Sequence, residues 1–149
     1  MRMTTKGRYG VRAVVNLARE AADHPVPISR IAEEEHLSAE FLEQIFFKLK
    51  KAGLIRSIRG PKGGFLLNGK AAEISLKTIL DAVGEPLYPV PCTNGRAEKR
   101  CSRQSSCSMS PVWQNFSRLI QDYLARISLE DIIAKKPGQE GASIQTGPG

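Results

Sequence analysis

Residues 29–65 carry the sequence SRIAEEEHLSAEFLEQIFFKLKKAGLIRSIRGPKGGF, in which two helix-forming segments precede a glycine-rich turn. Ser29 is expected to begin a short helix over residues 29–35. After the connection His36-Leu37, Ser38 is expected to cap a longer helix over residues 39–52, because its hydroxyl accepts a bond from a free backbone amide. The predicted apolar face of this second helix comprises Phe41, Leu42, Ile45 and Leu49. Two helices joined by a short turn are typical of a helix-turn-helix unit.

Residues 54–58 and 65–67 are short apolar segments on either side of the turn Arg59-Gly60-Pro61-Lys62-Gly63-Gly64. Two such segments around a Gly- and Pro-rich turn predict a β-hairpin. In a helix-turn-helix the N-terminal residues of the second helix lie nearest the base edges of DNA. The candidates here are Ser38, Ala39, Glu40, Glu43 and Gln44. Glutamine pairs with adenine and glutamate accepts from cytosine, although such units also serve in packing or dimerisation.

Charge favours the DNA interpretation. The chain has 149 residues and a formal net charge of +7, which indicates an anionic partner. From Gln44 to Ala72 there is no acidic residue, while seven basic residues occur: Lys48, Lys50, Lys51, Arg56, Arg59, Lys62 and Lys70. Arg59 and Lys62 at the hairpin tip are expected to contact phosphates, or Arg59 the minor groove. Gly60 allows close backbone approach. Predicted DNA contacts also include Lys48 and, near the basic N-terminus, Lys6.

Helical spacing also predicts helices near residues 5–20, where Thr5 is the expected cap, and over residues 75–83, 110–127 and 129–134. The long helix carries seven large apolar residues: Trp113, Phe116, Leu119, Ile120, Tyr123, Leu124 and Ile127. These pack either within one chain or against a second copy. The predicted fold is mainly α with a small β-hairpin wing, a winged helix-turn-helix plus a long C-terminal dimerisation helix. We expect a DNA-binding domain at 1–83, a cysteine loop at 84–109, a dimerisation region at 110–134 and a disordered tail at 135–149.

No apolar run exceeds three residues. A membrane helix or a signal peptide needs a much longer run, so we expect a cytoplasmic protein without membrane contact. No nucleophile–base constellation, P-loop or dinucleotide fingerprint is found, so an enzyme is not expected.

The three cysteines are Cys92, Cys101 and Cys107, with eight and five residues between them. An odd number cannot pair fully within one chain, and clustered cysteines in a reducing compartment indicate metal or redox chemistry. Structural zinc sites usually begin with a tighter cysteine pair. Nearby Arg96, Lys99, Arg100 and Arg103 favour the thiolate form. Spacing alone leaves reduced thiols, zinc and an iron–sulfur cluster open.

Several of these stretches resemble the Rrf2 family of bacterial winged-helix regulators, which includes the IscR, NsrR and CymR types. The similar segments are Thr5 to Ala13 (TKGRYGVRA), Phe41-Leu42-Glu43-Gln44-Ile45, Gly53-Leu54 and Arg59 to Phe65 (RGPKGGF). The resemblance implies a homodimer on a near-palindromic double-stranded DNA operator, with the wing beside the recognition helix. It implies that Glu43 helps to select the operator class. It also implies that Cys92, Cys101 and Cys107 bind a 2Fe–2S cluster.

The chain departs from the family at the fourth cluster ligand. Ser110 stands where the IscR type has a histidine, and Arg8 stands where the NsrR type has an acidic residue. Ser110, a partner residue, or an exogenous thiol or water are the remaining candidates, and such a cluster is expected to be labile.

The predicted function is a DNA-binding transcriptional regulator whose operator binding is modulated by a 2Fe–2S cluster that senses iron–sulfur, redox or nitric oxide status. The alternatives are a metal-independent regulator that senses a small molecule, and a cluster carrier or redox protein with a vestigial DNA head.

Overall fold

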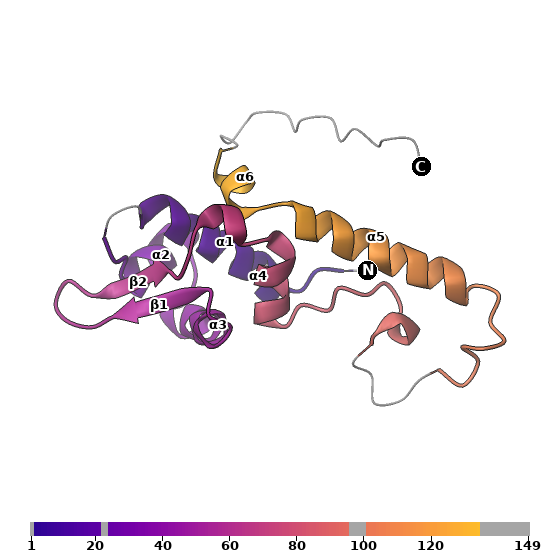
Figure 1. Ribbon diagram of the computed structural model, residues 1–149. Helices are drawn as coiled ribbons and strands as arrows, with labels where there is room; N and C mark the ends of the chain where they lie inside the picture. Colours follow the sequence, from indigo (N-terminus) through magenta and orange to yellow (C-terminus); the bar gives the residue numbers. More distant parts are fainter. Residues whose placement is uncertain (1, 22–23, 96–100, 135–149) are drawn as a thin grey trace.

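The computed structural model describes residues 2–21, 24–95 and 101–134 (Figure 1). Its helices and strands are, in chain order, α1 (Thr5–Glu20), α2 (Ile28–Glu35), α3 (Ala39–Lys51), β1 (Ile55–Ile58), β2 (Gly64–Leu67), α4 (Leu76–Val83), α5 (Ser110–Arg126) and α6 (Leu129–Ala134). Two short 3-10 turns, η1 (Ala71–Glu73) and η2 (Pro91–Thr93), complete the set. The predicted mainly helical fold with a β-hairpin wing is therefore confirmed. Over the described residues, no helix is long and apolar enough to cross a membrane.

A single apolar core joins α1, α2, α3 and α4 with the base of the hairpin. The fully buried side chains include Val14, Leu17, Ile31, Leu42, Ile45, Leu49 and Ile79. α1 approaches α4 closely at Gly10, where an added β-carbon would lie 2.9 Å from Cγ1 of Val83. A larger residue at position 10 would therefore separate the two helices.

The apolar face of α3 differs by one residue from the predicted set. Phe46, which the prediction omitted, is buried, whereas Phe41 is only partly buried. Phe46 packs edge-on against Phe65 of β2, with ring centroids 4.9 Å apart. The hairpin therefore packs on the side of α3 that carries Phe46.

The two strands pair antiparallel from Ile55 opposite Leu67 to Ile58 opposite Gly64. A third extended segment joins them at Val26, whose amide donates to the carbonyl of Phe65 at 3.0 Å and whose carbonyl accepts from Phe65 at 2.8 Å. This isolated β-bridge beside the two-stranded sheet fixes the hairpin to the segment just before α2.

Two helix starts differ from the prediction. Thr4, not Thr5, caps α1, and its hydroxyl accepts a bond from the Gly7 amide at 3.1 Å. α2 begins at Ile28 after Pro27, without a side-chain cap, and not at Ser29. The physical reason is tertiary in both cases. The Glu85 carboxylate accepts a hydrogen bond from the backbone amide of Thr4 at 2.8 Å and so fixes the start of α1. The backbone pairing of Val26 with Phe65 keeps the chain extended up to Pro27.

The solvent side of α1 and α2 is polar. Arg12 pairs with Glu35 at 2.7 Å, and the amide of Asn16 donates to Glu34 at 2.8 Å. The hydrogen bonds from Asn16 and Arg30 hold the pKa of Glu34 below its usual value. At exposed positions such contacts contribute little stability, so the apolar core dominates this helix pair.

α5 projects from the core with its first residues at the far end, so the chain runs back along α5 and reaches α6 beside the core (Figure 1). Leu129 of α6 is fully buried in the core, and its amide donates to the carbonyl of Ile74 at 2.7 Å. Part of the segment expected to serve dimerisation thus packs on the core of the domain expected to bind DNA. The expected disordered tail, residues 135–149, lies outside the described residues.

Replacing Gly64 with alanine should destabilise the fold. An added β-carbon would overlap the carbonyl group of Val26 and lie 2.8 Å from the nitrogen of Pro27. We expect a loss of about 1–3 kcal/mol from this overpacking, measured by urea unfolding. The matched control is Gly69→Ala, which also has a positive φ (140°) but meets no described heavy atom within 4 Å. Equal unfolding midpoints for the two variants would contradict the close approach of β2 to Val26.

Candidate nucleic-acid interface and cysteine segment

α3 presents one stripe to the core and the opposite stripe to solvent. Ser38 caps the helix as predicted, and its hydroxyl accepts from the Phe41 amide at 3.2 Å. The predicted base-contacting residues Ser38, Ala39, Glu40, Glu43 and Gln44 are all exposed. The structure therefore brings these residues together on one accessible helix face.

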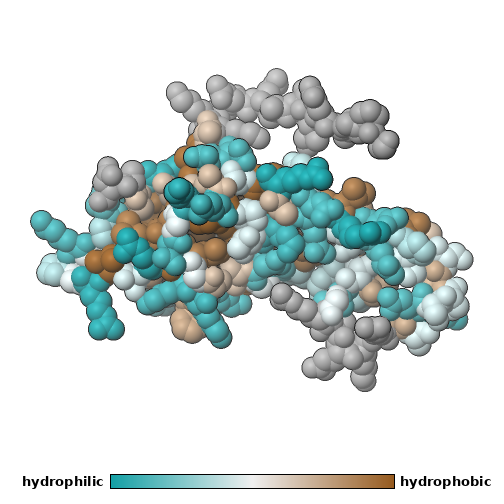
Figure 2. All heavy atoms as spheres, in the orientation of Figure 1, coloured by the Kyte–Doolittle hydropathy of each residue, from teal (hydrophilic) through white to brown (hydrophobic). Residues whose placement is uncertain are grey.

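The hairpin lies beside α3 and projects past it (Figure 1). Its tip residues Arg59, Gly60 and Lys62 are exposed, and Figure 2 shows hydrophilic side chains at this end of the molecule. Besides the contact of Phe46 with Phe65, the Lys50 amine donates to the Ser57 hydroxyl at 2.7 Å. The helix and the wing are thus fixed to each other by an apolar and a polar contact.

Two predicted DNA contacts lie elsewhere. Lys6 is half-buried at the start of α1. Lys48 is half-buried, and its amine donates to the carbonyl of Val83 at 3.1 Å. This carbonyl belongs to the last residue of α4, so a cation there is favoured by the helix dipole. Contact of either lysine with DNA stays a prediction.

The residues Val83, Gly84 and Glu85 form a junction between α4 and the cysteine segment. Glu85 is only 6% exposed, and its carboxylate accepts from both the amide and the hydroxyl of Thr4. An added β-carbon at Gly7 would overlap this carboxylate, so α1 leaves space for it. Because the Lys48 amine also donates to the Val83 carbonyl, the junction contacts both α3 and the start of α1.

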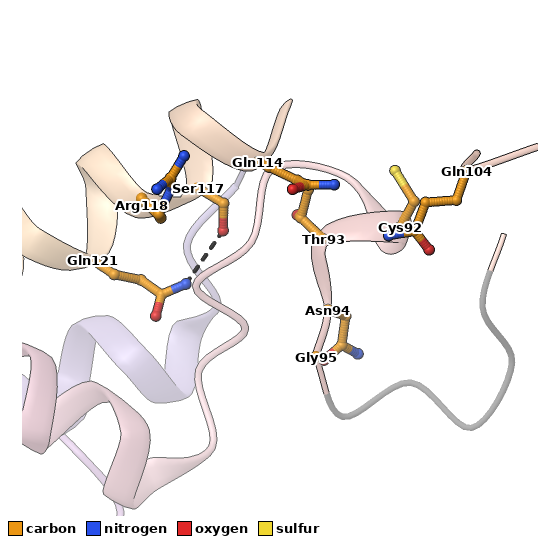
Figure 3. A pocket seen from close by; sticks show the side chains of 9 residues that line it. All are labelled: Cys92, Thr93, Asn94, Gly95, Gln104, Gln114, Ser117, Arg118 and Gln121. Atoms are coloured by element: carbon orange, nitrogen blue, oxygen red, sulfur yellow. Dashed lines mark hydrogen bonds between the residues drawn. The ribbon is translucent and has the colours of Figure 1, made fainter. Parts of the chain in front are cut away.

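Within the cysteine segment, residues 84–109, the turn η2 packs against α5. Cys92 lies in η2, is half-buried and lines a cavity of about 400 Å³ (Figure 3). The cavity is mostly polar, and its other lining residues are Thr93, Asn94, Gly95, Gln104, Gln114, Ser117, Arg118 and Gln121. Cys101 and Cys107 are exposed and do not line this cavity. All three cysteines are free thiols.

In the described residues the three cysteine thiols do not form a metal-binding cluster. Among them, no three His, Cys, Asp or Glu side chains lie close enough together to hold a metal ion. Ser110, a candidate fourth ligand, is buried, and its hydroxyl accepts from the side-chain amide of Gln114 at 3.1 Å. Arg103 is exposed, whereas Arg96, Lys99 and Arg100 lie outside the described residues. Three free thiols on one segment fit an iron–sulfur cluster in donor chemistry, although the segment would have to rearrange to bring them together.

The profile of the Rrf2 family, described as an iron-dependent transcriptional regulator, matches residues 3–135. The chain belongs to the Rrf2 family. It is 37% identical over 136 residues to the HTH-type transcriptional regulator IscR of Pectobacterium atrosepticum, covering 91% of this chain and 81% of that protein.

Two solved structures of the Rrf2 type share this fold. IscR of T. potens aligns with a TM-score of 0.71 at 30% identity, covering 95% of this chain and 94% of the other. CymR of B. subtilis, described as the global cysteine regulator, also aligns with a TM-score of 0.71, at 28% identity, covering 90% and 97%. This Rrf2 protein is therefore a winged-helix transcriptional regulator by family and by fold.

Two features of the structure go beyond the predictions made from the sequence. Glu85 and Thr4 are 81 residues apart, and no local pattern connects them. The sequence prediction says nothing of Phe47, an apolar residue that is 69% exposed on α3. Its helical phase, one residue beyond the core position Phe46, is the signal that would have placed it on the solvent side.

Glu85→Ala should lower the free energy of unfolding by about 1–3 kcal/mol, because the amide and hydroxyl of Thr4 lose a largely buried acceptor. The matched control is Glu73→Ala, which removes an exposed carboxylate from η1. Thermal and urea unfolding of both variants measure the difference. If the two variants unfold alike, Glu85 does not hold the N-terminus to the junction.

Proposed function

We propose that this Rrf2 protein is a homodimeric regulator that binds a near-palindromic DNA operator through α3 and the wing, with an affinity modulated by a 2Fe–2S cluster. The observation that carries the DNA-binding part is the exposed stripe of α3, fixed beside a hairpin whose tip is basic. A helix of this kind enters the major groove with its N-terminal residues against the bases.

The residues divide by chemistry. Glu43 would accept from cytosine and Gln44 would pair with adenine. Arg59 and Lys62, exposed at the wing tip, would contact phosphates or the minor groove. Ser38, Ala39 and Glu40 lie at the start of the same face.

The homodimer is supported by the outer face of α5. Only Ser110 and Ser117 of this helix are buried, whereas four large apolar residues are exposed: Val112, Phe116, Leu119 and Tyr123. Their spacing places them on one face, and Figure 2 shows brown patches along α5. Trp113, Ile120 and Leu124 are half-buried, so packing within the chain accounts for only part of the predicted stripe. A second copy of α5 would cover the rest and set the half-site spacing near one DNA turn.

Leu119→Lys should weaken dimerisation, because Leu119 is 67% exposed on this apolar face and a lysine there would be desolvated by a partner. We expect a shift toward monomer in sedimentation velocity and a loss of tight operator binding. Ala125→Lys is the matched control, since it adds the same exposed charge on a different face of α5. A monomeric wild-type protein, or identical behaviour of the two variants, would contradict the assignment of this face.

Cys92, Cys101 and Cys107 would hold the cluster as thiolates, and the fourth ligand would come from Ser110, the partner or an exogenous group. A bound 2Fe–2S cluster supplies a centre whose oxidation state, or loss, reports the chemical signal. The three cysteines would hold their segment in one arrangement when the cluster is bound. The segment begins at Gly84, within the junction, and the junction contacts both Thr4 and Lys48. A change in the segment therefore has a physical connection to α1 and α3.

Operator titrations should separate the cluster-loaded protein from the metal-free protein by about 5- to 150-fold in affinity, the usual range of allosteric coupling. The protein would be purified without oxygen, analysed for iron, sulfide and absorption, and titrated against a duplex enriched from random sequence. The variants Cys92→Ala, Cys101→Ala and Cys107→Ala should bind no cluster and behave as the metal-free protein. Ser105→Ala, an exposed change in the same segment, should behave as wild type. Equal affinities of all forms would refute the modulation.

A metal-independent regulator is the second candidate. It is favoured by the described residues, in which no three potential ligand side chains lie close enough together to hold a metal ion. A colourless, iron-free protein after anaerobic purification, with full operator affinity, would establish it.

A further inference from the structure

Phe47 stands out on the solvent side of α3. Its neighbours Leu42, Ile45, Phe46 and Leu49 are at most 1% exposed, whereas Phe47 is 69% exposed. A phenyl ring left in water forgoes the burial that would stabilise it. Its environment is polar or charged, because the other exposed residues of the middle and end of α3 are Glu43, Gln44, Lys50 and Lys51.

Phe47 lies on the same face of α3 as the predicted base-contacting residues. Glu40, Glu43, Gln44 and Phe47 follow the spacing i, i+3, i+4 and i+7, which places them on one helix face. The same spacing separates the base-contacting residues of the homeodomain recognition helix. Phe47 continues the stripe that begins with the predicted base contacts.

We propose that Phe47 is a specificity-determining residue that contacts the 5-methyl groups of thymine in the major groove. This inference rests on the proposed binding of DNA through α3. The phenyl ring of phenylalanine has no polar atom to pair with a base edge, and the thymine methyl group is the apolar feature of the major groove. Cytosine and guanine offer no such group at the same place.

The helix geometry limits which bases are involved. Phe47 lies three residues beyond Gln44, about 4.5 Å along the helix axis at 1.5 Å per residue. Base pairs are about 3.4 Å apart along DNA. With the axis of α3 lying along the groove, Phe47 would contact thymine one or two base pairs from the base contacted by Gln44.

The local surface favours DNA over a protein as the occupant. Lys50 and Lys51, on the next turn, are exposed, and Lys50 is directed to the wing through Ser57. From Gln44 to Ala72 the chain has no acidic residue. Phe47 thus lies between Glu43 and Gln44 on one side and Lys50 and Lys51 on the other, and the basic side, continued by the wing, fits a phosphate-lined groove.

The test removes only the methyl groups. The probe is a duplex enriched from a random-sequence library by the full-length wild-type protein. Each thymine is replaced singly by uracil, which keeps the base pair and lacks the methyl. Wild type should bind about fourfold more weakly at one or two positions per half-site, the effect of one buried carbon. Phe47→Ala should bind the thymine and uracil duplexes equally at those positions, and Phe47→Leu should keep part of the difference.

The outcomes are distinct. If wild type shows no uracil sensitivity, or if Phe47→Ala retains it, the proposal is wrong. If Phe47→Ala changes the sedimentation coefficient and leaves uracil sensitivity intact, Phe47 belongs to a protein contact, which also overturns it. If the wild-type protein enriches no duplex, the proposed binding of DNA through α3 fails first. Phe47 is exposed, so unfolding curves of both variants should match wild type and exclude a folding defect.

Discussion

Burial of one stripe of α3 is the constraint on which the rest of the structure depends. Leu42, Ile45 and Leu49 have no exposed surface, so the helix cannot rotate without opening the core. At 100° per residue, this burial places Glu43 and Gln44 on the solvent side. The same helix carries Phe46, which holds the hairpin through Phe65. The face that would contact DNA and the wing beside it are therefore oriented by a single packing arrangement.

The junction between α4 and the cysteine segment gives the proposed regulation a physical route. Glu85 is buried and bonded to Thr4, and Lys48 is bonded to Val83. These contacts join the start of α1 and the last turn of α3 to the point where the cysteine segment leaves the core. A rearrangement of that segment would act on a site that already contacts both helices.

α5 divides its two faces by chemistry. On the inner face Gln114 and Gln121 donate to Ser110 and Ser117, and this face borders the polar cavity beside Cys92 (Figure 3). The outer face is apolar and exposed. One helix therefore connects the cysteine segment to the surface proposed for dimerisation, so that a change at one face has a short path to the other.

The order of the helices, the hairpin, the Ser38 cap and the long α5 followed from the sequence, because capping residues, turn residues and apolar spacing act over a few positions. Contacts between distant residues decided the rest. The cap at Thr4 depends on Glu85, the start of α2 depends on Phe65, and the direction of Lys48 depends on α4. Phe46 and Phe47 are the same amino acid at adjacent positions, and only the phase of α3 against the core buries one and exposes the other. Local pattern determines that a helix forms, whereas the side on which it is buried is a property of the assembled core.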